Sequence, residues 1–454
     1  MDLLSIQAIV VRLLPTSAKQ IINRIDSSSL GTRLVRGAFW SIAGAAISRG
    51  LGLVSSVIVA RTLGKSGFGE LGIIQSTIMV FGTFAGFGLG MTATKFIAQY
   101  RTTDPKKAGR IRALSSVFAW VTSIITALIL FLLAPWVAEH ALAAPHLTEL
   151  FQIGVPFLLL TSVNGAQMGV LSGFEDFRAL AIISLVSGLI SFPFMVGGVY
   201  IAGIRGAVWG MVVNAGFNWL LSHFVIRRVC ERNGVPYTYE GCWAEKEVLW
   251  KFSLPAVISS MFFAPTDWIL NAMLVNQPDG YGQMGILNAA KQWHILILYL
   301  PNMLSGMTLP ILSNLLGENQ KKQYNKMLIL NSLMLTGLAI VVALPVSIFS
   351  KFIMSTYGNG FSEAWYVLVF VSIYSVLWAS NIVVGQAMWS SGASNEAMIF
   401  AAIRSFILLV SGYMLVKYGA AGLTLSMVIT YCIQTLYLVP YVKYKTSGLF
   451  TTNE

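Results

Sequence analysis

Five residues whose side chains carry or can accept a charge lie inside otherwise apolar segments of the chain. They are Arg49, Asp267, Lys291, His294 and Arg404. A charged side chain near the centre of a bilayer is costly, so residues of this kind are candidates for function. A guanidinium group donates hydrogen bonds to two phosphate oxygens at once, which suits an anionic cargo. The sequence therefore predicts that Arg49 contacts such a cargo, and that Arg404 and Lys291, with His294 nearby, receive it along the way.

Asp267 and Lys291 allow two interpretations. They are expected at similar depths in consecutive apolar segments, so Asp267 could simply neutralise Lys291. Alternatively, Asp267 follows Pro265, where backbone carbonyls are freed, and could couple transport to a proton or monovalent cation. We expect no other cofactor. His294 lies one turn from Lys291 on the same helix face, where it is either a packing residue or a direct ligand. If the acid and the lysine pair, neither Arg49 nor Arg404 has an acidic partner in any span.

The segments that carry these residues have the composition of a membrane protein. Apolar residues make up 56% of the 454 residues and charged residues only 11%, whereas a soluble domain carries about a quarter charged residues. About 20 apolar residues cross a ~30 Å hydrocarbon core. We predict twelve spans, at residues 36–60, 68–92, 112–134, 148–172, 178–201, 206–227, 248–275, 283–312, 326–350, 362–388, 397–416 and 420–441.

The positions of the basic residues predict how the chain is oriented. The net charge of +12 could suggest a nucleic-acid partner. If the N-terminus is cytoplasmic, however, 22 of the 30 Lys and Arg residues fall on the cytoplasmic side, five fall outside, and three lie within spans. This asymmetry is typical of the positive-inside rule. It predicts a multi-pass membrane protein with both termini in the cytoplasm, and it leaves little basic surface for nucleic acid.

A repeat divides the spans into two halves. SGFGELGI at 66–73 returns as DGYGQMGI at 279–286, each at the start of the second span of its half. Three further echoes follow in order: GMT at 90–92 and 306–308, Gln167 and Gln386, and the Gly203 and Gly419 turns. Halves of six spans enter the membrane from the same side, so the repeats are parallel. We therefore predict an all-α polytopic membrane protein with twelve transmembrane helices in two parallel six-helix lobes around a central cleft.

The predicted organisation has five parts. Residues 1–30 form an amphipathic segment on the cytoplasmic leaflet, with a disordered tail as the alternative. The N-lobe covers 31–228, a cytoplasmic loop covers 229–247, the C-lobe covers 248–443, and a cytoplasmic tail covers 444–454. Pro255, Pro265, Pro301 and Pro310 should bend the first two spans of the C-lobe, and Gly82, Gly86, Gly88 and Gly90 should make the second span of the N-lobe bendable.

Uncharged amides inside the spans give a softer signal. They could line the cleft and meet sugar hydroxyls, but hydrogen bonds between helices explain them equally well. They are Gln75, Asn164, Gln167, Asn214, Asn218, Asn271, Asn288, Gln292 and Gln386.

Three stretches near the N-terminus carry a family resemblance. RGAFWSIAG at 36–44, ARTLGKSGFGELGI at 60–73 and GFGLGMTATKFIAQYR at 86–101 resemble the opening of Wzx-type lipid-linked oligosaccharide flippases. These belong to the multidrug/oligosaccharidyl-lipid/polysaccharide exporter superfamily. The Pro often found after the Arg-x-Leu-Gly turn is Lys65 here. The resemblance implies that an undecaprenyl-diphosphate-linked glycan moves from the cytoplasmic to the outer leaflet of a bacterial inner membrane. A polysaccharide polymerase and chain-length proteins are the partners it implies.

Other functions remain as alternatives. A membrane-embedded glycosyltransferase or polymerase needs a large outer loop with catalytic groups, and the outer loops are short, so we expect no enzyme. A cation-coupled multidrug exporter of the same superfamily is the main rival. Cationic drugs call for buried acids, and the interior of the first-half spans contains none (Glu70 sits at the outer mouth), whereas it does contain Arg49. A lipid II flippase is a further alternative, although such proteins usually have fourteen spans.

Overall fold

The computed structural model describes residues 29–249, 253, 262–305, 308–318, 320–391 and 393–449. The predicted interfacial segment at 1–30 therefore lies outside the described residues, except for its last two. The described residues form helices and connecting turns, with no strand among them. This confirms the predicted all-α class.

In the first half of the chain, residues 29–232 form five α-helices and one short π-helical turn. These are α3 (Ser29–Gly86), α4 (Leu89–Tyr100), α5 (Pro105–Trp136), η1 (Val137–Ala141), α6 (Leu147–Gly173) and α7 (Phe177–Arg232). Aspartates cap two of these helices: the side chain of Asp104 accepts a hydrogen bond from the Lys107 backbone N–H, and that of Asp176 accepts one from Ala179. Such caps satisfy amide groups that the first turn of a helix leaves free.

α3 and α7 are each interrupted once. Gly64 (φ 71°) breaks α3, and Gly203 (φ 56°) breaks α7. A residue without Cβ takes these values at little cost. The chain folds back at both points, because Gly198 contacts Gly206 across the second break, and Ser55 and Gln75 line one cavity on either side of the first. Both breaks fall in the predicted connections between spans.

The described residues of the second half form nine α-helices. They are α9 (Ala264–Val275), α10 (Gly280–Ile297), α11 (Tyr299–Ser305), α12 (Thr308–Gly317), α13 (Lys321–Ile348), α14 (Ser350–Thr356), α15 (Trp365–Ser390), α16 (Ser394–Leu415) and α17 (Gly419–Leu449). The helix that begins at Gly280 is interrupted at Leu298, just before Pro301. A similar interruption separates α3 from α4 at Gly88. Both agree with the bends predicted for these spans, whereas Pro255 lies outside the described residues.

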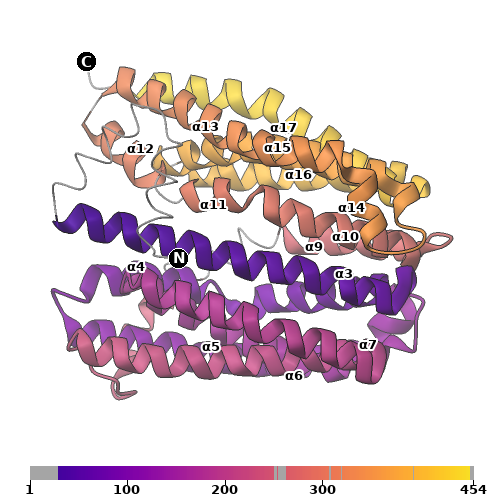
Figure 1. Cartoon of the computed structure of the whole chain (residues 1–454). Helices are drawn as coiled ribbons and strands as arrows, with labels where there is room; N and C mark the ends of the chain where they lie inside the picture. Colours follow the sequence, from indigo (N-terminus) through magenta and orange to yellow (C-terminus); the bar gives the residue numbers. More distant parts are fainter. Residues whose placement is uncertain are drawn as a thin grey trace, which may run out of the picture.

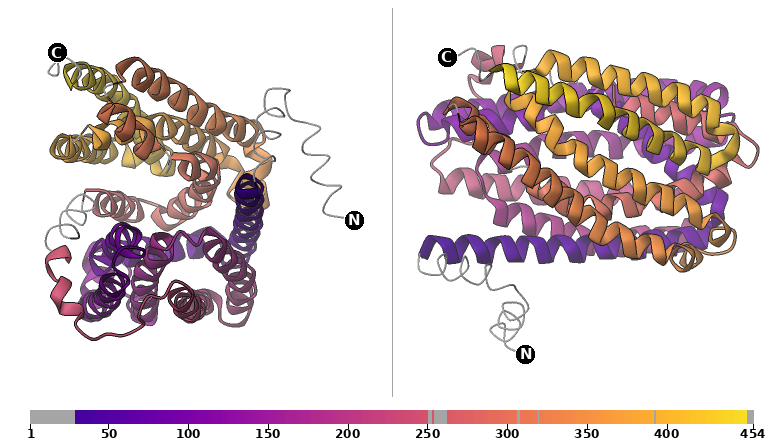
Figure 2. Two further views of the ribbon diagram at one scale, coloured as in Figure 1. Left: turned by 90° about the vertical axis from the view of Figure 1, so that its left-hand side faces the viewer. Right: turned by 90° about the horizontal axis from the view of Figure 1, so that it is seen from above.

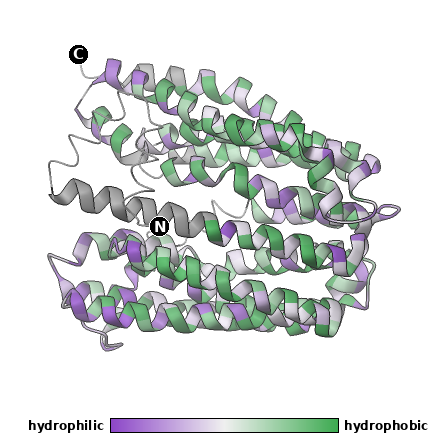
Figure 3. Ribbon diagram, in the orientation of Figure 1, coloured by the Kyte–Doolittle hydropathy of each residue, from purple (hydrophilic) through white to green (hydrophobic). Residues whose placement is uncertain are grey.

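The helices form two groups with an apolar middle zone. Figure 1 shows α4–α7 on one side and α9–α17 on the other, with the first part of α3 between them, and the end-on view in Figure 2 separates the same groups. Within the described ranges, seven helices are long and apolar enough to cross a membrane. Hydrophobic residues dominate the middle of the helices and hydrophilic residues gather toward their ends (Figure 3). The protein is therefore a multi-pass membrane protein.

The two echoed octapeptides pack directly against each other. A Cβ placed on Gly69 would lie 1.8 Å from the Tyr281 carbonyl oxygen, and one on Gly285 would lie 2.1 Å from that of Lys65. An ion pair of 2.7 Å joins Lys65 to Asp279 beside this contact. We call this region, Lys65–Gly72 with Asp279–Gly285, the glycine contact. It joins α3 to α10 at one end of the helices.

Residues 233–249 connect the halves and lie along α5. The short 3-10 helix η2 (Cys242–Glu245) is part of this connection. Arg110 donates two hydrogen bonds to Glu245, at 2.8 and 3.0 Å. Cys242 and Leu249 are buried in a cluster with Ala113 and Leu114. We call residues 233–249 the strap.

Candidate functional site

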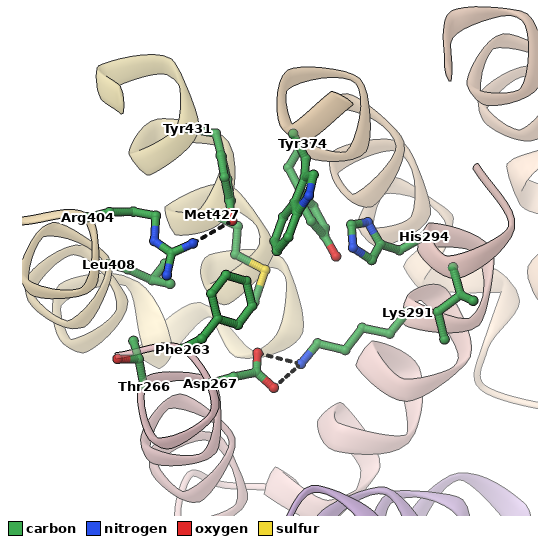
Figure 4. Close-up of a pocket in the computed structure, with 12 residues that line it drawn as sticks. Phe263, Thr266, Asp267, Lys291, His294, Tyr374, Arg404, Leu408, Met427 and Tyr431 are labelled. Atoms are coloured by element: carbon green, nitrogen blue, oxygen red, sulfur yellow. Dashed lines mark hydrogen bonds and ion pairs between the residues drawn. The ribbon is translucent and has the colours of Figure 1, made fainter. Parts of the chain in front are cut away.

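The predicted charged residues of the second half meet around one cavity of about 240 Å³. It lies among α9, α10, α15, α16 and α17, and Figure 4 shows the side chains that face it. Four of the five predicted site residues line it: Asp267, Lys291, His294 and Arg404. We call this space the Arg404 cavity. The sequence placed these residues in three separate spans, and the packing of α9, α10 and α16 brings them together.

Arg404 is the cavity residue with no charged partner. α16 carries it into the interior, where it is only 8% exposed. Its guanidinium lies 4.2 Å from the centre of the Phe263 ring, and one N–H group donates to the Tyr431 hydroxyl at 3.4 Å. Its Nε atom has no hydrogen-bond partner, and no carboxylate of the described chain forms an ion pair with it. An arginine does not lose its proton, so a positive charge stays in the cavity.

Lys291 and Asp267 form the ion pair that the sequence suggested. The Lys291 amine donates to the two Asp267 oxygens at 2.9 and 3.0 Å, and to Asn271 Oδ1 at 3.4 Å. The Asn271 amide in turn donates to Asp267 at 3.2 Å. The Lys291–Asp267 pair carries no net charge, and Arg404 is the further cation that lines the cavity. The unpaired Arg404 therefore gives the cavity a net charge of +1.

His294 is held by packing contacts. Its Nδ1 atom lies 2.8 Å from the Ser375 hydroxyl, and its ring stacks on Tyr374 with centroids 4.6 Å apart. Trp378 lies edge-on to the same ring at 5.5 Å. The imidazole is thus part of an aromatic wall. These are the contacts expected for the packing interpretation, and they still leave the ring at the edge of the cavity.

Arg49 lies on the other side of α10. It lines a separate pocket of about 110 Å³ with Ser48, Gly52 and Leu53 of α3 and with Gln292, Ile295 and Leu296 of α10. Ile295 also lines the Arg404 cavity. Lys291 and His294 face one side of α10, while Gln292 and Leu296 face the other. The structure therefore does not bring Arg49 into the same cavity as Arg404.

A larger cavity adjoins the Arg49 pocket. It measures about 310 Å³ and shares Gly52 and Gln292 with that pocket. We call it the amide cavity, because four of the nine predicted amides line it: Gln75, Asn214, Asn288 and Gln292. The carbonyl oxygen of the Asn214 side chain is buried without a hydrogen-bond partner. The cavity thus offers polar groups beside Arg49.

Other amides bond within the helix bundle instead. Asn164 donates to Gln167 and to Ser222, at 3.3 and 3.0 Å. Asn218 donates to Ser187, and Asn271 supports the Asp267 pair. For these residues, hydrogen bonds within the helix bundle explain the amide side chains, rather than contact with a cargo.

Arg112 is a buried residue that is not among the predicted site residues. The predicted orientation places it on the cytoplasmic side, and its side chain is 2% exposed. Its place at the start of the third predicted span was the only available signal.

Comparison with known proteins decides the family. A model of the family described as polysaccharide biosynthesis protein matches residues 34–316. The chain belongs to this family. This membership agrees with the resemblance to Wzx-type flippases of the multidrug/oligosaccharidyl-lipid/polysaccharide exporter (MOP) superfamily that the three N-terminal stretches carry.

Relatives and a solved structure agree with this membership. The chain is 25% identical over 408 residues to the EPS I polysaccharide export inner membrane protein EpsE of Ralstonia nicotianae, covering 87% of this chain and 90% of EpsE. It is 21% identical to the lipid III flippase of Escherichia coli, covering 88% and 96%. An inward-facing multidrug resistance MATE family transporter of the MOP superfamily has a TM-score of 0.75 at 14% identity, covering 91% and 100%. That likeness shows a shared fold.

Proposed function

We propose that this flippase moves undecaprenyl-diphosphate-linked oligosaccharide repeat units from the cytoplasmic to the outer leaflet for cell-surface polysaccharide synthesis. The relatives support the substrate class, because one is named a polysaccharide export protein and the other a lipid III flippase. The diphosphate would be the part of the cargo that the protein's positive charges recognise.

The observation that carries the proposal is the unpaired charge of Arg404. It is 8% exposed, faces a cavity, and has an Nε–H group with no acceptor. A buried cation without a counter-charge is costly, so its retention favours an anionic ligand. The phosphate oxygens of the cargo are acceptors that a guanidinium binds in pairs. Lys291, already held by Asp267, would add charge at longer range.

Arg49 and the amide cavity support a second part of the same path. Arg49 has an exposed side chain and no ion-pair partner among the described residues. The neighbouring amide cavity carries donors and acceptors that suit sugar hydroxyls. In this proposal the diphosphate first meets Arg49, with the glycan against the amides, and α10 separates that position from the Arg404 cavity. Movement of α10 would be needed to pass the charge from one arginine to the other.

The architecture in this proposal has twelve spans in two parallel six-helix lobes, in the bacterial inner membrane with both termini in the cytoplasm. The fold-back at Gly64 and Gly203 supports counting α3 and α7 as two spans each. The glycine contact would then lie on the outer side and close it. Further bonds support that closure: Arg61 donates to the Thr356 carbonyl at 2.6 Å and Tyr281 to the Leu142 carbonyl at 2.7 Å. Alternating access would require these contacts to separate.

Multidrug export is the second candidate, because the fold is shared with a MATE transporter. The charges favour the glycan. No acid is among the described residues that line the Arg49 pocket or the amide cavity, and Asp267 is already bound to Lys291. A cationic drug would find no free carboxylate in these three spaces. A proton or monovalent cation at Asp267 stays part of the proposal, as do a polymerase and chain-length proteins as partners.

Reconstitution tests the proposal. The purified flippase is placed in liposomes that carry an undecaprenyl-diphosphate-linked oligosaccharide, and the glycan that becomes accessible to a glycosidase on the opposite side is measured over time. We expect transfer above the rate of protein-free liposomes. Cationic dye export by the same liposomes is the comparison. Dye export without glycan transfer would overturn the proposal in favour of a drug exporter.

A further inference from the structure

A second buried arginine lies outside the Arg404 cavity, the Arg49 pocket and the amide cavity. Arg112 of α5 is 2% exposed, and its Nε atom has no hydrogen-bond partner. One of its terminal nitrogens donates to the Thr238 carbonyl of the strap at 2.8 Å. Its guanidinium lies 3.9 Å from the Tyr237 ring centre and 4.8 Å from that of Tyr239. No carboxylate in the described part of the chain forms an ion pair with it.

Arg112 faces a small, partly enclosed cavity of about 20 Å³. Ser116, Gln167, His223 and Tyr237 supply the other polar groups of its wall. A space of about 10–15 Å³ already holds one water-sized particle, so this cavity admits a single small ion or water and nothing larger. It is unrelated to the diphosphate path, because no glycan or lipid headgroup fits it.

The polar groups around this cavity are mainly donors. The Gln167 side-chain oxygen already accepts from Asn164 at 3.3 Å, which leaves its NH₂ group for the cavity. The Tyr237 hydroxyl lies 3.4 Å from His223 Nδ1. Burial raises the pKa of Tyr237, so its hydroxyl keeps its proton. A permanent cation and several donors without an acid favour an anion over a neutral water.

We propose that this cavity is a binding site for one small monovalent inorganic anion of the halide type, held by Arg112 with Gln167 and Ser116. The anion neutralises Arg112, which in turn holds the strap through Thr238 and two tyrosine rings. Occupancy therefore stabilises the docking of the strap on α5. The site is independent of which cargo the flippase carries.

Chloride serves as the probe. The thermal unfolding temperature of the purified protein is measured in detergent at constant ionic strength while chloride replaces gluconate, which is too large for the cavity. We expect the unfolding temperature to rise by about 2 °C as the chloride concentration increases and then to level off, because the stabilisation comes from ligand binding to the folded protein. Arg112→Gln should remove this response. Crystals grown in bromide should show an anomalous peak within hydrogen-bond distance of Arg112.

Arg110→Gln is the matched control. Arg110 lies two residues away and also holds the strap, through an ordinary ion pair with Glu245, so its loss should lower stability but keep the chloride response. Gln167→Leu retains Arg112, and should raise the chloride midpoint about tenfold by removing one donor to the ion. If Arg112→Gln does not fold, the Gln167→Leu variant still tests the proposal. An unfolding temperature independent of chloride, an equal response in Gln167→Leu, or a cavity without a bromide peak would overturn the proposal.

Discussion

Gly69 and Gly285 meet where α3 crosses α10: the position that a Cβ of Gly69 would occupy is 2.8 Å from the Gly285 backbone nitrogen. The two residues come from octapeptides that the chain repeats 213 residues apart. The repeat therefore marks a physical contact as well as a duplicated sequence. Absence of a side chain at both positions lets the two backbones approach closely.

Replacing Gly285 with alanine should open this contact. The added Cβ would lie 2.1 Å from the Lys65 carbonyl oxygen, and overpacking of this kind costs about 1–3 kcal/mol. The population with the glycine contact separated should rise about tenfold. The measurement is labelling of a cysteine at Phe68, which is 2% exposed, by an impermeant maleimide added outside cells, in a protein whose exposed Cys432 is replaced by serine.

Gly50→Ala is the control, because nothing lies within 4 Å of a Cβ at that position. It should leave the labelling of the Phe68 cysteine unchanged. Equal labelling in the Gly285→Ala and Gly50→Ala proteins would mean that the glycine contact does not hold the two segments together.

Much of the fold follows from local sequence. The observed helices α5, α6 and α13 begin and end within a few residues of the predicted spans, except for an early start of α5 at Pro105. Apolar length and capping residues are local properties, so they can be read along the chain. The pairing of Lys291 with Asp267 was also predictable, because consecutive spans with matching depths are neighbours.

Relationships across helices were less accessible. Depth alone does not show which face of α10 a residue occupies, so the separation of Arg49 from Arg404 could not be foreseen. The burial of Arg112 depends on the strap folding over α5, which no periodicity within α5 reports. The same holds for the amides: only packing decides that Asn214 faces a cavity while Asn164 bonds to Gln167.

The break in α3 should depend on the absence of a side chain at Gly64. Nothing lies within 4 Å of a Cβ there, so Gly64→Ala tests backbone strain at φ 71° rather than a steric clash with neighbours. We expect a loss of about 1–2 kcal/mol in the free energy of unfolding, seen as a lower unfolding temperature in detergent. Gly197→Ala, in α7 with equally open surroundings, should cause no loss. Equal stability of the two variants would contradict this explanation.

The Lys291–Asp267 pair should show strong coupling in a double-mutant cycle. Asp267→Asn leaves the lysine charge unpaired, and Lys291→Gln does the same to the carboxylate, so each single change should lower the amount of folded protein in the membrane. The double variant should recover most of the lost folded protein, with a coupling free energy of about 1–3 kcal/mol between the two sites. Immunoblots of detergent-extracted protein measure the levels. If the double variant yields no more folded protein than the worse single variant, the two charges do not stabilise each other.

Binding of the cargo by the two unpaired arginines tests the central claim most directly. Purified protein is titrated with an undecaprenyl-diphosphate-linked oligosaccharide and complexes are counted by native mass spectrometry. Arg404→Gln and Arg49→Gln should each weaken binding about tenfold or more, because each loses charged hydrogen bonds to phosphate. Arg205→Gln, which removes an exposed ion pair with Glu149, should bind like the unaltered protein. Equal affinity in all four proteins would contradict a path in which positive charge recognises the diphosphate.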